Sequence, residues 1–585
     1  MSKEDAELGV ASATPPLEGD EKAIQDRPQP GDGNIPHDFR ELDFWTRNGL
    51  NLRSFTKRDW GTGDIELDRS MKTRHLHMIA IGGSIGAGFF VGSGSALTRG
   101  GPGSILICFS IAGVMIFNVV HALGELAVMY PVSGGFYTYS VRFIDPSWGF
   151  AMGWNYVFQW LIVLPLELTV CSFTVEYWRR DVSPAVWITF FWVVIIVVNI
   201  FGTLGYAEEE FMSSVFKLAA IVIFMIVAIV LICGGGPAGG KYDEYWGSRL
   251  WHTPGAFQNG FRGFCSVFVT AAFSYAGSEL VGLAAAESAN PARALPGAIK
   301  QVFWRITLFY LIGLSLVGLL VSSRDPRLLN ARNPYAEGTS PFVLAALDAG
   351  LYGYDSFMNV VICISVVSIG VSCVYGGSRT LSALAKQGYA PQIFTYVDKS
   401  GRPLASVVFL LIWGALAYVV LAAHGSVVFD WLLALSGLAA LFTWGSICLA
   451  HVRFRNAWNS QGRSMDRIPF KAAGGIYGSY VGLLLCGVIL AAQVYVAIDP
   501  GPTPEGETPP TPGDRAENFF LNVLALPVVL FFWLCGYLWK RTGWLRLDQI
   551  DLDTGLREHN WDEINEYRAV VASWPKWRRA LHYVF

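Results

Sequence analysis

Long runs of apolar residues alternate with short polar segments along most of this chain. Each run is close to the roughly 20 residues that an α-helix needs to cross a lipid bilayer. Twelve runs occur, at residues 75–98, 104–130, 148–177, 184–204, 211–234, 260–286, 299–322, 355–378, 403–423, 428–451, 475–498 and 518–539. The pattern predicts an all-α polytopic membrane protein with about 12 transmembrane helices in a domain spanning residues 71–539.

The two ends of the chain are polar. Residues 1–70 are rich in Pro, Gly, Asp and Glu, which is typical of a disordered tail, and residues 540–585 form a second polar tail. The chain does not begin with a short apolar segment and a cleavage site, so no signal peptide is expected. An even number of crossings puts both tails on one side, and the basic residues of the loops favour the cytoplasm for that side.

Composition agrees with a membrane protein. Apolar residues make up 52% of the 585 positions and charged residues 15%, whereas about a quarter of a soluble protein is usually charged. The net charge of -3 argues against a nucleic-acid partner. The nine cysteines form no CxxC pair and no cluster with histidine. We therefore interpret them as small core residues rather than metal ligands or a disulfide framework.

Two of the apolar runs contain segments that do not suit a continuous helix. The first run holds GGSIGAGFF at Gly82–Phe90, and the sixth holds FSYAGSE at Phe273–Glu279. Each interior glycine costs about 1 kcal/mol relative to alanine, so both segments are predicted to unwind. Two interrupted helices, five helices apart, are what an inverted five-helix repeat would produce. The alternative is that the glycines of the first run only allow close helix packing.

The ends of such half-helices carry useful polarity. An N-terminal end has free N–H groups and a partial positive charge, which suit a carboxylate, and unwound carbonyl groups suit an ammonium group. Together these ends would recognise the backbone of an α-amino acid and ignore its side chain. A nucleotide-binding loop is a weaker interpretation, because no strand precedes Gly82 and the chain has no GxxxxGK sequence there.

Eight short segments, in order and spread over about 400 residues, resemble one family. They are Met78–Gly88, Ala122–Ala127, Pro131–Phe136, Leu164–Leu168, Phe216–Lys217, Ala272–Gly282, Ser378–Thr380 and Gly401–Leu404. With them the chain resembles the fungal amino-acid permease family, within the amino acid–polyamine–organocation superfamily. Cys265–Ala272 and Gln301–Tyr310 make it most similar to the general amino acid permeases. Where family members often have threonine in the first-helix motif, this chain has Ser84 and Ala87.

The resemblance implies a fold, an activity and a location. The fold has 12 helices, of which the first ten form two inverted repeats. The activity is import of L-amino acids by proton symport, over a broad range, with the proton as coupling ion and no bound cofactor. The location is the plasma membrane, with both termini cytoplasmic. The expected partners are amino acids, the lipid bilayer and the ubiquitin ligase machinery, which would act on tail lysines such as Lys3, Lys22 and Lys57; the alternative for these lysines is solvated charge alone.

The candidate substrate-binding residues lie at the two breaks. The N–H groups of Ile85, Gly86 and Ala87 would bind the carboxylate, with Ser84 and Gly88 in the same turn. The carbonyls of Ser274 and Ala276 would bind the amino group. The resemblance implies that Phe273 is a gate over the bound substrate; an ordinary core aromatic is the alternative.

Ionisable residues within the runs require an explanation, because inserting one at the centre of a membrane helix costs at least about 2.5–3.5 kcal/mol. By the resemblance, Lys217 stands where other superfamily members bind sodium, and we expect it to gain and lose a proton as the site opens and closes. The alternative is a lysine that snorkels to the inner interface. Glu279 is expected to anchor the sixth-helix break or to cap free N–H groups. Glu167 faces the substrate pocket by resemblance, or has a structural role.

His121 and Glu125 lie one helical turn apart on the second run, so they share a face. They could form a proton relay or a hydrogen-bond network at an inner gate. Neither is expected to bind a metal, because the sequence places no third ligand nearby.

Four other interpretations of the function are considered beside a broad-range importer. An amino-acid-sensing receptor on a permease scaffold is compatible with the long tails, and a permease of narrow specificity is compatible with the same fold. An enzyme is not expected, because no HExxH or GxSxG sequence occurs. A channel is disfavoured, because broken helices at mid-membrane suit an occluding site better than a continuous pore.

Overall fold

The structure is a computed structural model that describes residues 45, 50–57, 71–131, 135–179, 181–288, 291–329, 340–422, 425–499, 511–557 and 561–579. The chain divides into two units, Met1–Asn48 and Gly49–Phe585, and every element below belongs to the second. The described residues form helices, with two isolated β-bridges and no strand. The predicted tail at 1–70 lies mostly outside the described residues.

Nine helical spans among the described residues are long and apolar enough to cross a bilayer. They are Gly92–Met129 (α5), Pro146–Val175 (α7), Gly202–Ile232 (α9), Gly260–Ala286 (α10 and α11), Ala294–Leu320 (α12, η4 and α13), Tyr354–Lys386 (α16), Leu404–Leu421 (α17 and η6), Leu435–Ser460 (in α18) and Gly475–Ile498 (α19). The compound spans divide into α10 (Gly260–Tyr275), α11 (Leu280–Ala286), α12 (Pro291–Trp304), η4 (Arg305–Gly313), α13 (Leu314–Leu320), α17 (Leu404–Trp413) and η6 (Gly414–Leu421), and α18 as a whole is Gly425–Ser460.

The other three predicted runs are helical in less regular ways. The first is divided among α3 (Thr73–Gly82), α4 (Ala87–Phe90) and the start of α5. The fourth is the shorter helix α8 (Pro184–Ile200), and the twelfth is the bent pair α20 (Pro512–Val523) and α21 (Ala525–Lys540). All of the predicted runs are therefore helical, and the predicted all-α polytopic fold is confirmed.

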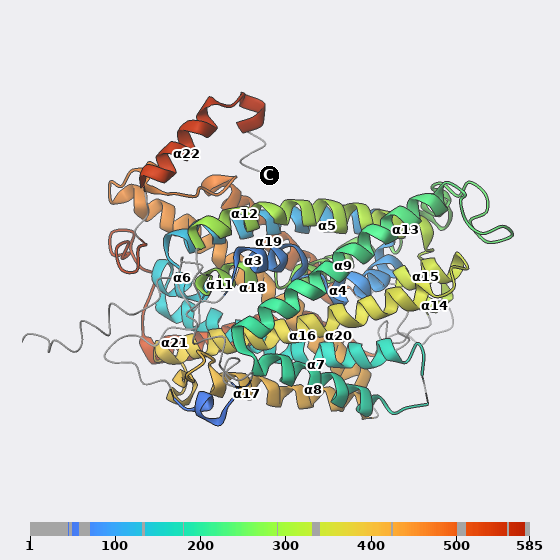
Figure 1. The fold of residues 1–585 in the computed structure, drawn as a ribbon, viewed down its shortest axis with the longest axis horizontal. Coiled ribbons are helices and arrows are strands. Elements are labelled where there is room, and N and C mark those ends of the chain that lie inside the picture. The colour runs from blue at the N-terminus through green and yellow to red at the C-terminus, as the bar shows by residue number, and fades with distance from the viewer. Residues whose placement is uncertain are drawn as a thin grey trace, which may run out of the picture. The chain divides into compact units, whose positions relative to one another are not determined.

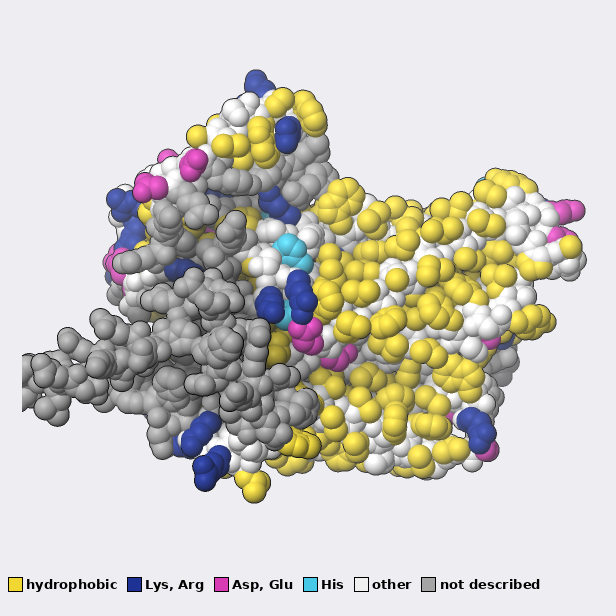
Figure 2. Space-filling model, in the orientation of Figure 1, with side chains coloured by type: hydrophobic (Ala, Val, Ile, Leu, Met, Phe, Trp, Pro, Cys, Tyr) yellow, Lys and Arg dark blue, Asp and Glu magenta, His cyan; other side chains and the backbone are white. Residues whose placement is uncertain are grey.

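The outer surface of the helices is apolar where lipid would lie. Helix α9 exposes Val222, Ile226 and Ile229 on one side and buries Lys217 and Ile221 on the other. Helices α8, α9 and α16 lie side by side (Figure 1). Figure 2 shows hydrophobic side chains covering the face over these helices, with charged side chains toward its ends. An apolar surface this extensive is typical of a protein that faces a membrane.

The first and sixth spans are both interrupted, as predicted. Helix α3 ends at Gly82, the chain is non-helical through Gly86, and α4 begins at Ala87. Helix α10 ends at Tyr275, and α11 begins at Leu280 after a turn in which Gly277 has a φ of +90°. Breaks in the first and sixth spans are the arrangement of a 5+5 inverted repeat.

The glycines of the first break also allow close packing. A Cβ on Gly82 would lie 2.0 Å from the Ser214 hydroxyl oxygen, and one on Gly86 would lie 2.4 Å from the Ile369 side chain. The predicted unwinding is therefore confirmed, and the alternative that these glycines only allow close packing is wrong. The segment unwinds, and its neighbours occupy the space that side chains would need.

Segments near both ends of the chain pack on the face that carries the basic loops. The Lys399 amide donates hydrogen bonds to the carbonyls of Ser54 and Thr56, at 3.2 and 3.1 Å. At the other end, Leu552 is buried in residues 541–557, and Arg463 pairs with Asp553 at 2.8 Å. Both terminal segments therefore lie on one side, as the even number of crossings predicts. Residues 541–557 are docked rather than a free tail.

Candidate functional site

A cavity lies between the two broken helices. Residues from four spans line it: Gly83, Ser84, Gly86, Ala87 and Gly88 from the first, Trp160, Val163 and Glu167 from α7, Phe273, Ala276 and Gly277 from the sixth, and Ile369 and Ser372 from α16. Seven of the nine residues predicted to bind substrate are in this set. The structure thus brings together two segments that are almost 190 positions apart in the sequence.

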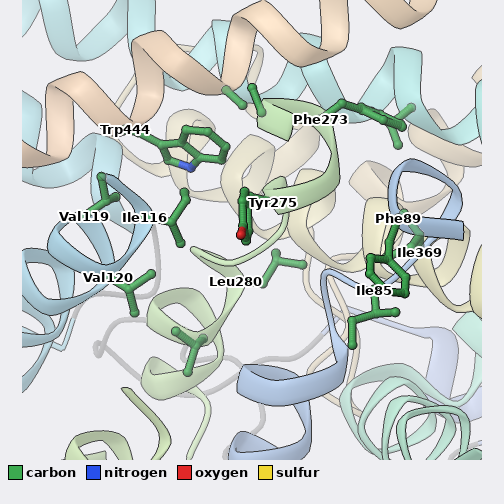
Figure 3. Close-up of a cluster of buried hydrophobic side chains, with 14 of the residues drawn as sticks. Ile85, Phe89, Ile116, Val119, Val120, Phe273, Tyr275, Leu280, Ile369 and Trp444 are labelled. Carbon is green, nitrogen blue, oxygen red and sulfur yellow. The ribbon is translucent and has the colours of Figure 1, made fainter. Parts of the chain in front are cut away.

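Ile85 and Ser274 are the two predicted residues outside the cavity lining. The Ile85 N–H donates to the Gly82 carbonyl at 3.0 Å, and its side chain lies among buried hydrophobic groups with Phe89 and Ile369 (Figure 3). The Ser274 carbonyl accepts a hydrogen bond from the Tyr310 hydroxyl at 2.7 Å. Their predicted backbone groups are therefore already bonded within the protein. A tight turn occupies the Ile85 N–H, and a tertiary contact from η4 occupies the Ser274 carbonyl; residue spacing reveals neither.

The cavity has helix ends of opposite polarity on its two sides. Helix α4 begins at Ala87, so its first N–H groups point toward the break. On the other side, α10 ends at Tyr275, and Ala276 continues in an extended conformation with φ -57° and ψ 142°. A helix N-terminus carries partial positive charge and a C-terminus partial negative charge. The arrangement is suited to a ligand that carries a carboxylate and an ammonium group.

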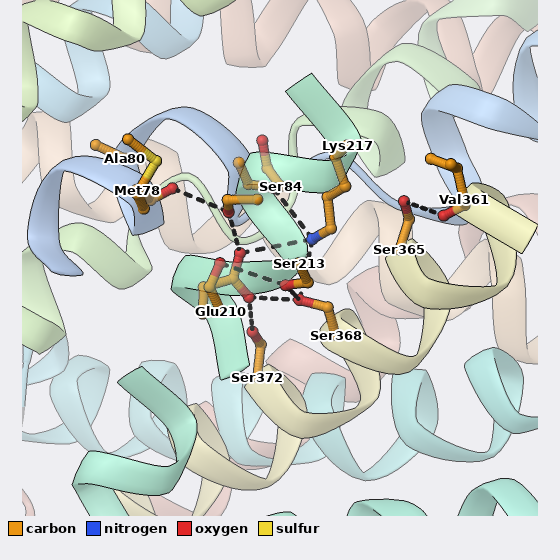
Figure 4. Close-up of polar contacts among 12 residues, drawn as sticks. Met78, Ala80, Ser84, Glu210, Ser213, Lys217, Val361, Ser365, Ser368 and Ser372 are labelled. Atoms are coloured by element: carbon orange, nitrogen blue, oxygen red, sulfur yellow. Dashed lines mark hydrogen bonds and ion pairs between the residues drawn. The ribbon is translucent and has the colours of Figure 1, made fainter. Parts of the chain in front are cut away.

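Lys217 is fully buried beside the break in the first span. Its Nζ donates to the Ser368 hydroxyl at 3.0 Å and reaches the Gly82 carbonyl at 3.5 Å (Figure 4). The amine does not snorkel to the interface, because its side chain has no solvent exposure. Its contact with the carbonyl end of α3 places it at the first break, and its exchange of a proton stays a prediction.

Glu210 is the partner of Lys217 that the sequence analysis missed. Its Oε1 lies 3.5 Å from the Lys217 Nζ, and both side chains are fully buried. Hydroxyl groups of Ser214 and Ser368 donate to the carboxylate at 2.9 and 2.6 Å, and Ser372 lies at 3.4 Å. The signal was the seven-residue spacing, which puts Glu210 and Lys217 on one helix face. It was missed because the apolar run was taken to begin at Phe211.

The two other predicted carboxylates are both buried. Glu167 lines the cavity, and its Oε2 has no hydrogen-bond partner among the described residues. Glu279 accepts a hydrogen bond from the indole N–H of Trp444 at 3.0 Å. The Glu279 side chain makes no capping hydrogen bond at the start of α11, but backbone N–H groups of Gly277 and Glu279 lie close to its carboxyl in the break, so both predicted roles stay open. Glu279 joins the sixth-span break to α18.

The π-helical segment η4 supplies two residues that join the breaks. The Tyr310 hydroxyl lies 3.1 Å from the Ser84 carbonyl and 2.7 Å from the Ser274 carbonyl. Arg305 donates to the Ala80 carbonyl at 2.7 Å and to the Ser278 hydroxyl at 2.6 Å. A π-helix places residues five apart close to one face, and such segments are frequent at functional sites. The sequence analysis did not identify these roles, although an arginine inside an apolar run is a signal.

His121 and Glu125 do not form a pair with each other. Both oxygens of Glu125 accept hydrogen bonds from Arg455, at 2.8 and 2.6 Å, and the Ala472 amide donates to it at 2.6 Å. His121 Nδ1 instead lies 2.8 Å from the Phe117 carbonyl on its own helix. A direct relay between the two is therefore wrong. Glu125 belongs to a network on the side of the basic loops, because its partners lie at the end of α18 and before α19.

A second buried network, around Arg379, was also missed. Arg379 on α16 donates to Glu287 at 3.0 Å and to the Thr203 hydroxyl at 2.9 Å. The Thr203 hydroxyl donates to Glu287 at 2.8 Å. These bonds join the end of the sixth span to the start of α9 and to the C-terminal part of α16. Within the described residues, no group of three or more His, Cys, Asp or Glu side chains is placed to hold a metal ion.

The chain is similar to known proteins over most of its length. A family model described as "Amino acid permease" matches residues 75–549. The chain is 64% identical over 547 residues to amino-acid permease inda1 of Hypocrea atroviridis, covering 93% of this chain and 94% of that protein. It is 48% identical over 530 residues to general amino-acid permease GAP1 of Saccharomyces cerevisiae (88% and 86%) and 49% identical over 536 residues to general amino-acid permease GAP2 of Candida albicans (90% and 89%).

Proposed function

The chain belongs to the amino acid permease family, and on this premise we propose that it imports L-amino acids across the plasma membrane by proton symport. The observation that carries the proposal is the cavity between two helix breaks, with a buried lysine bonded to the carbonyl end of α3. The proposed range of substrates is broad, which the name of the general amino-acid permease relatives supports.

Recognition of the amino-acid backbone rests on main-chain groups. The substrate carboxylate binds the N–H groups at the start of α4, around Gly86, Ala87 and Gly88, and its ammonium group binds the carbonyl side of the sixth-span break near Ala276. Because these groups are common to all α-amino acids, this recognition does not discriminate among side chains. Phe273 closes over the bound substrate from the sixth span.

The substrate side chain lies against residues of α7 and α16. Val163, Trp160 and Ile369 supply apolar surface for neutral substrates. Glu167, whose Oε2 is unpaired, is available to a cationic side chain such as that of arginine. One cavity can therefore accept both neutral and basic amino acids.

Proton coupling is assigned to Lys217. When it is protonated, its ammonium group holds the Gly82 carbonyl and the Ser368 hydroxyl, so the end of α3 is fixed against α9 and α16. Loss of the proton removes the charge that binds this helix end. The inner half of the first span is then released, and the site opens toward the cytoplasm.

The termini are proposed to face the cytoplasm, where the basic loops lie. Lys57 is exposed beside Asp398, and it is a candidate for the ubiquitin ligase machinery. Lys3 and Lys22, the other two candidates, lie outside the described residues.

Uptake of labelled neutral and basic amino acids tests the proposal, in yeast that lacks its own permeases, with and without a protonophore. Uptake of many amino acids that the protonophore abolishes is the expected result. Protonophore-sensitive uptake of one narrow class of amino acids would support proton coupling but contradict the broad substrate range. No uptake by protein confirmed at the cell surface would favour a receptor that senses amino acids.

A further inference from the structure

Arg305 is a fully buried charge in the middle of a membrane span. Its side chain has no solvent exposure, and it lies in η4, within the span Ala294–Leu320. Placing a charged side chain at such a depth costs free energy. A charged residue there usually faces the protein interior and has a function. Neither the recognition of a substrate nor the proton exchange at Lys217 uses this arginine.

The guanidinium group joins the two broken helices directly. Its Nη1 donates to the Ala80 carbonyl at 2.7 Å, and its Nη2 donates to the Ser278 hydroxyl at 2.6 Å. Ala80 is in the last turn of α3, where carbonyl groups lack helical partners. Ser278 is in the break of the sixth span, and its own hydroxyl donates to the Tyr275 carbonyl at 2.6 Å. No ion pair to a carboxylate within 4.0 Å is formed by Arg305 among the described residues.

Two cations therefore bind the carbonyl end of α3, from different helices. Arg305 binds the Ala80 carbonyl from η4, and Lys217 reaches the Gly82 carbonyl from α9. Positive charge is favourable at a helix C-terminus. The two side chains differ in chemistry, because a lysine ammonium can lose its proton inside a protein whereas an arginine guanidinium stays charged.

The surroundings of the two cations differ as well. Lys217 faces Glu210 at 3.5 Å on its own helix, and Glu167 acts on it electrostatically from α7. The acidic residue that acts on Arg305 is Glu279, which is bonded to the Trp444 indole. Arg305 thus has hydrogen-bond acceptors that are neutral, a carbonyl and a hydroxyl. Its hydrogen bond to α3 therefore does not depend on the ionisation of a partner.

We propose that Arg305 is a positioning residue that latches the inner half of the first span to the sixth-span break through a permanent charge. The latch adds to the hold of Lys217 on α3, so that the inner side stays closed until Lys217 loses its proton and substrate does not leak past the site before then. This inference rests on the proposed amino-acid uptake. In this proposal Arg305 provides a permanent bond to the end of α3, and Lys217 exchanges the proton.

The test compares variants in whole cells at equal surface abundance. Arg305→Gln removes the charge, and Ser278→Ala removes one acceptor without changing the arginine. Arg305→Lys keeps a positive charge, and Arg515→Gln, on an exposed external helix, is the matched control. For each variant the net uptake of labelled leucine and the efflux of preloaded leucine are both measured.

A latch predicts opposite effects on the two quantities. Arg305→Gln lowers net accumulation and speeds efflux by about tenfold, the order expected for loss of a hydrogen bond to a charged group. Ser278→Ala gives a smaller increase in efflux, Arg305→Lys restores most of the retention, and Arg515→Gln behaves as the native protein. These results support the proposal.

Other outcomes overturn it. If uptake and efflux of the variants fall together, Arg305 serves the fold and not the latch. If Arg305→Gln does not reach the surface, unchanged efflux in Ser278→Ala overturns the proposal on its own. Absence of leucine uptake in the native protein would instead contradict the proposed function, and the two failures are therefore distinct.

Discussion

Glu210 and Lys217 form a buried charge pair whose two members depend on each other. Their side chains have no exposure, and their nearest charged atoms are 3.5 Å apart. Removing one member of such a pair leaves the other charge uncompensated, which typically costs about 3–5 kcal/mol. Serine hydroxyls cannot replace the carboxylate, because they carry no charge.

Replacing Glu210 with glutamine is therefore expected to reduce the maximum rate of amino-acid uptake by at least about tenfold. The reason is that Lys217 loses the carboxylate that favours its charged form beside α3. Radiolabelled uptake, divided by surface abundance, measures the effect. Glu208→Gln is the matched control, because Glu208 is 42% exposed and pairs with Arg74 at the surface. Native uptake in Glu210→Gln would remove Glu210 from the coupling machinery.

A second substitution, Glu167→Gln, separates substrate classes. We expect uptake of arginine to fall by about tenfold, because a cationic side chain loses its charged acceptor, while uptake of leucine changes little. Competition between the two labelled amino acids in one cell population measures the ratio. An unchanged ratio would place Glu167 outside the pocket.

The broken helices depend on backbone conformations that few residues can adopt. Gly277 has a φ of +90°, and a Cβ there would lie 3.3 Å from the Gly83 carbonyl oxygen. Most L-residues avoid this conformation, at a cost of roughly 1–2 kcal/mol. The turn that ends α10 therefore requires glycine at this position.

Gly277→Ala should lower the thermal stability of the purified protein and its uptake together. The change distorts the turn that positions Phe273 and Ala276 beside the cavity. Melting in detergent, followed by fluorescence-detected size exclusion, reports the stability. Gly487→Ala in α19 is the control, since a Cβ there meets no atom within 4 Å and alanine favours a helix. Equal melting of the two variants would contradict the argument.

The elements were predictable from the sequence because their signals are local. Apolar runs of membrane length predicted the spans, and the segments Gly82–Phe90 and Phe273–Glu279, which contain glycine, predicted the two breaks. Tyr310 and Arg305 could not be placed, because the π-helical register of η4 is not visible in spacing. The partners of Glu125 come from α18 and the following loop, and only tertiary packing brings them to α5. Glu210 lay one residue before its predicted run, where boundaries are least certain.

On the side of the basic loops, arginines from the membrane domain hold the C-terminal segment 541–557. Arg142 donates to the backbone carbonyls of Asp551 and Thr554, at 2.6 and 2.5 Å. Hydrogen bonds from Thr554, followed by backbone bonds and the charge of Arg142, keep the pKa of the Asp551 carboxyl below its ordinary value. A lowered pKa means that this stabilisation is complete at neutral pH and is lost only as the pH falls below about 4.

Arg142→Ala is expected to release this segment at pH 7. Amide hydrogen exchange over residues 541–557 should become at least about tenfold faster, because two hydrogen bonds from a charged donor are lost. Arg546→Ala, an exposed position in the same segment, should leave exchange unchanged. Native exchange rates in Arg142→Ala would contradict this role and show that Arg453, which donates to the Leu545 carbonyl, and Arg463 suffice to hold the segment.

Proton-coupled transport through Lys217 is the central part of the proposed mechanism. The most direct measurement is leucine accumulation in proteoliposomes with an imposed, inside-alkaline pH gradient, for the native protein and for Lys217→Met. The account predicts that the native protein concentrates leucine only while the gradient lasts, and that Lys217→Met does not concentrate it. Accumulation that ignores the gradient, or gradient-driven accumulation by Lys217→Met, would contradict it.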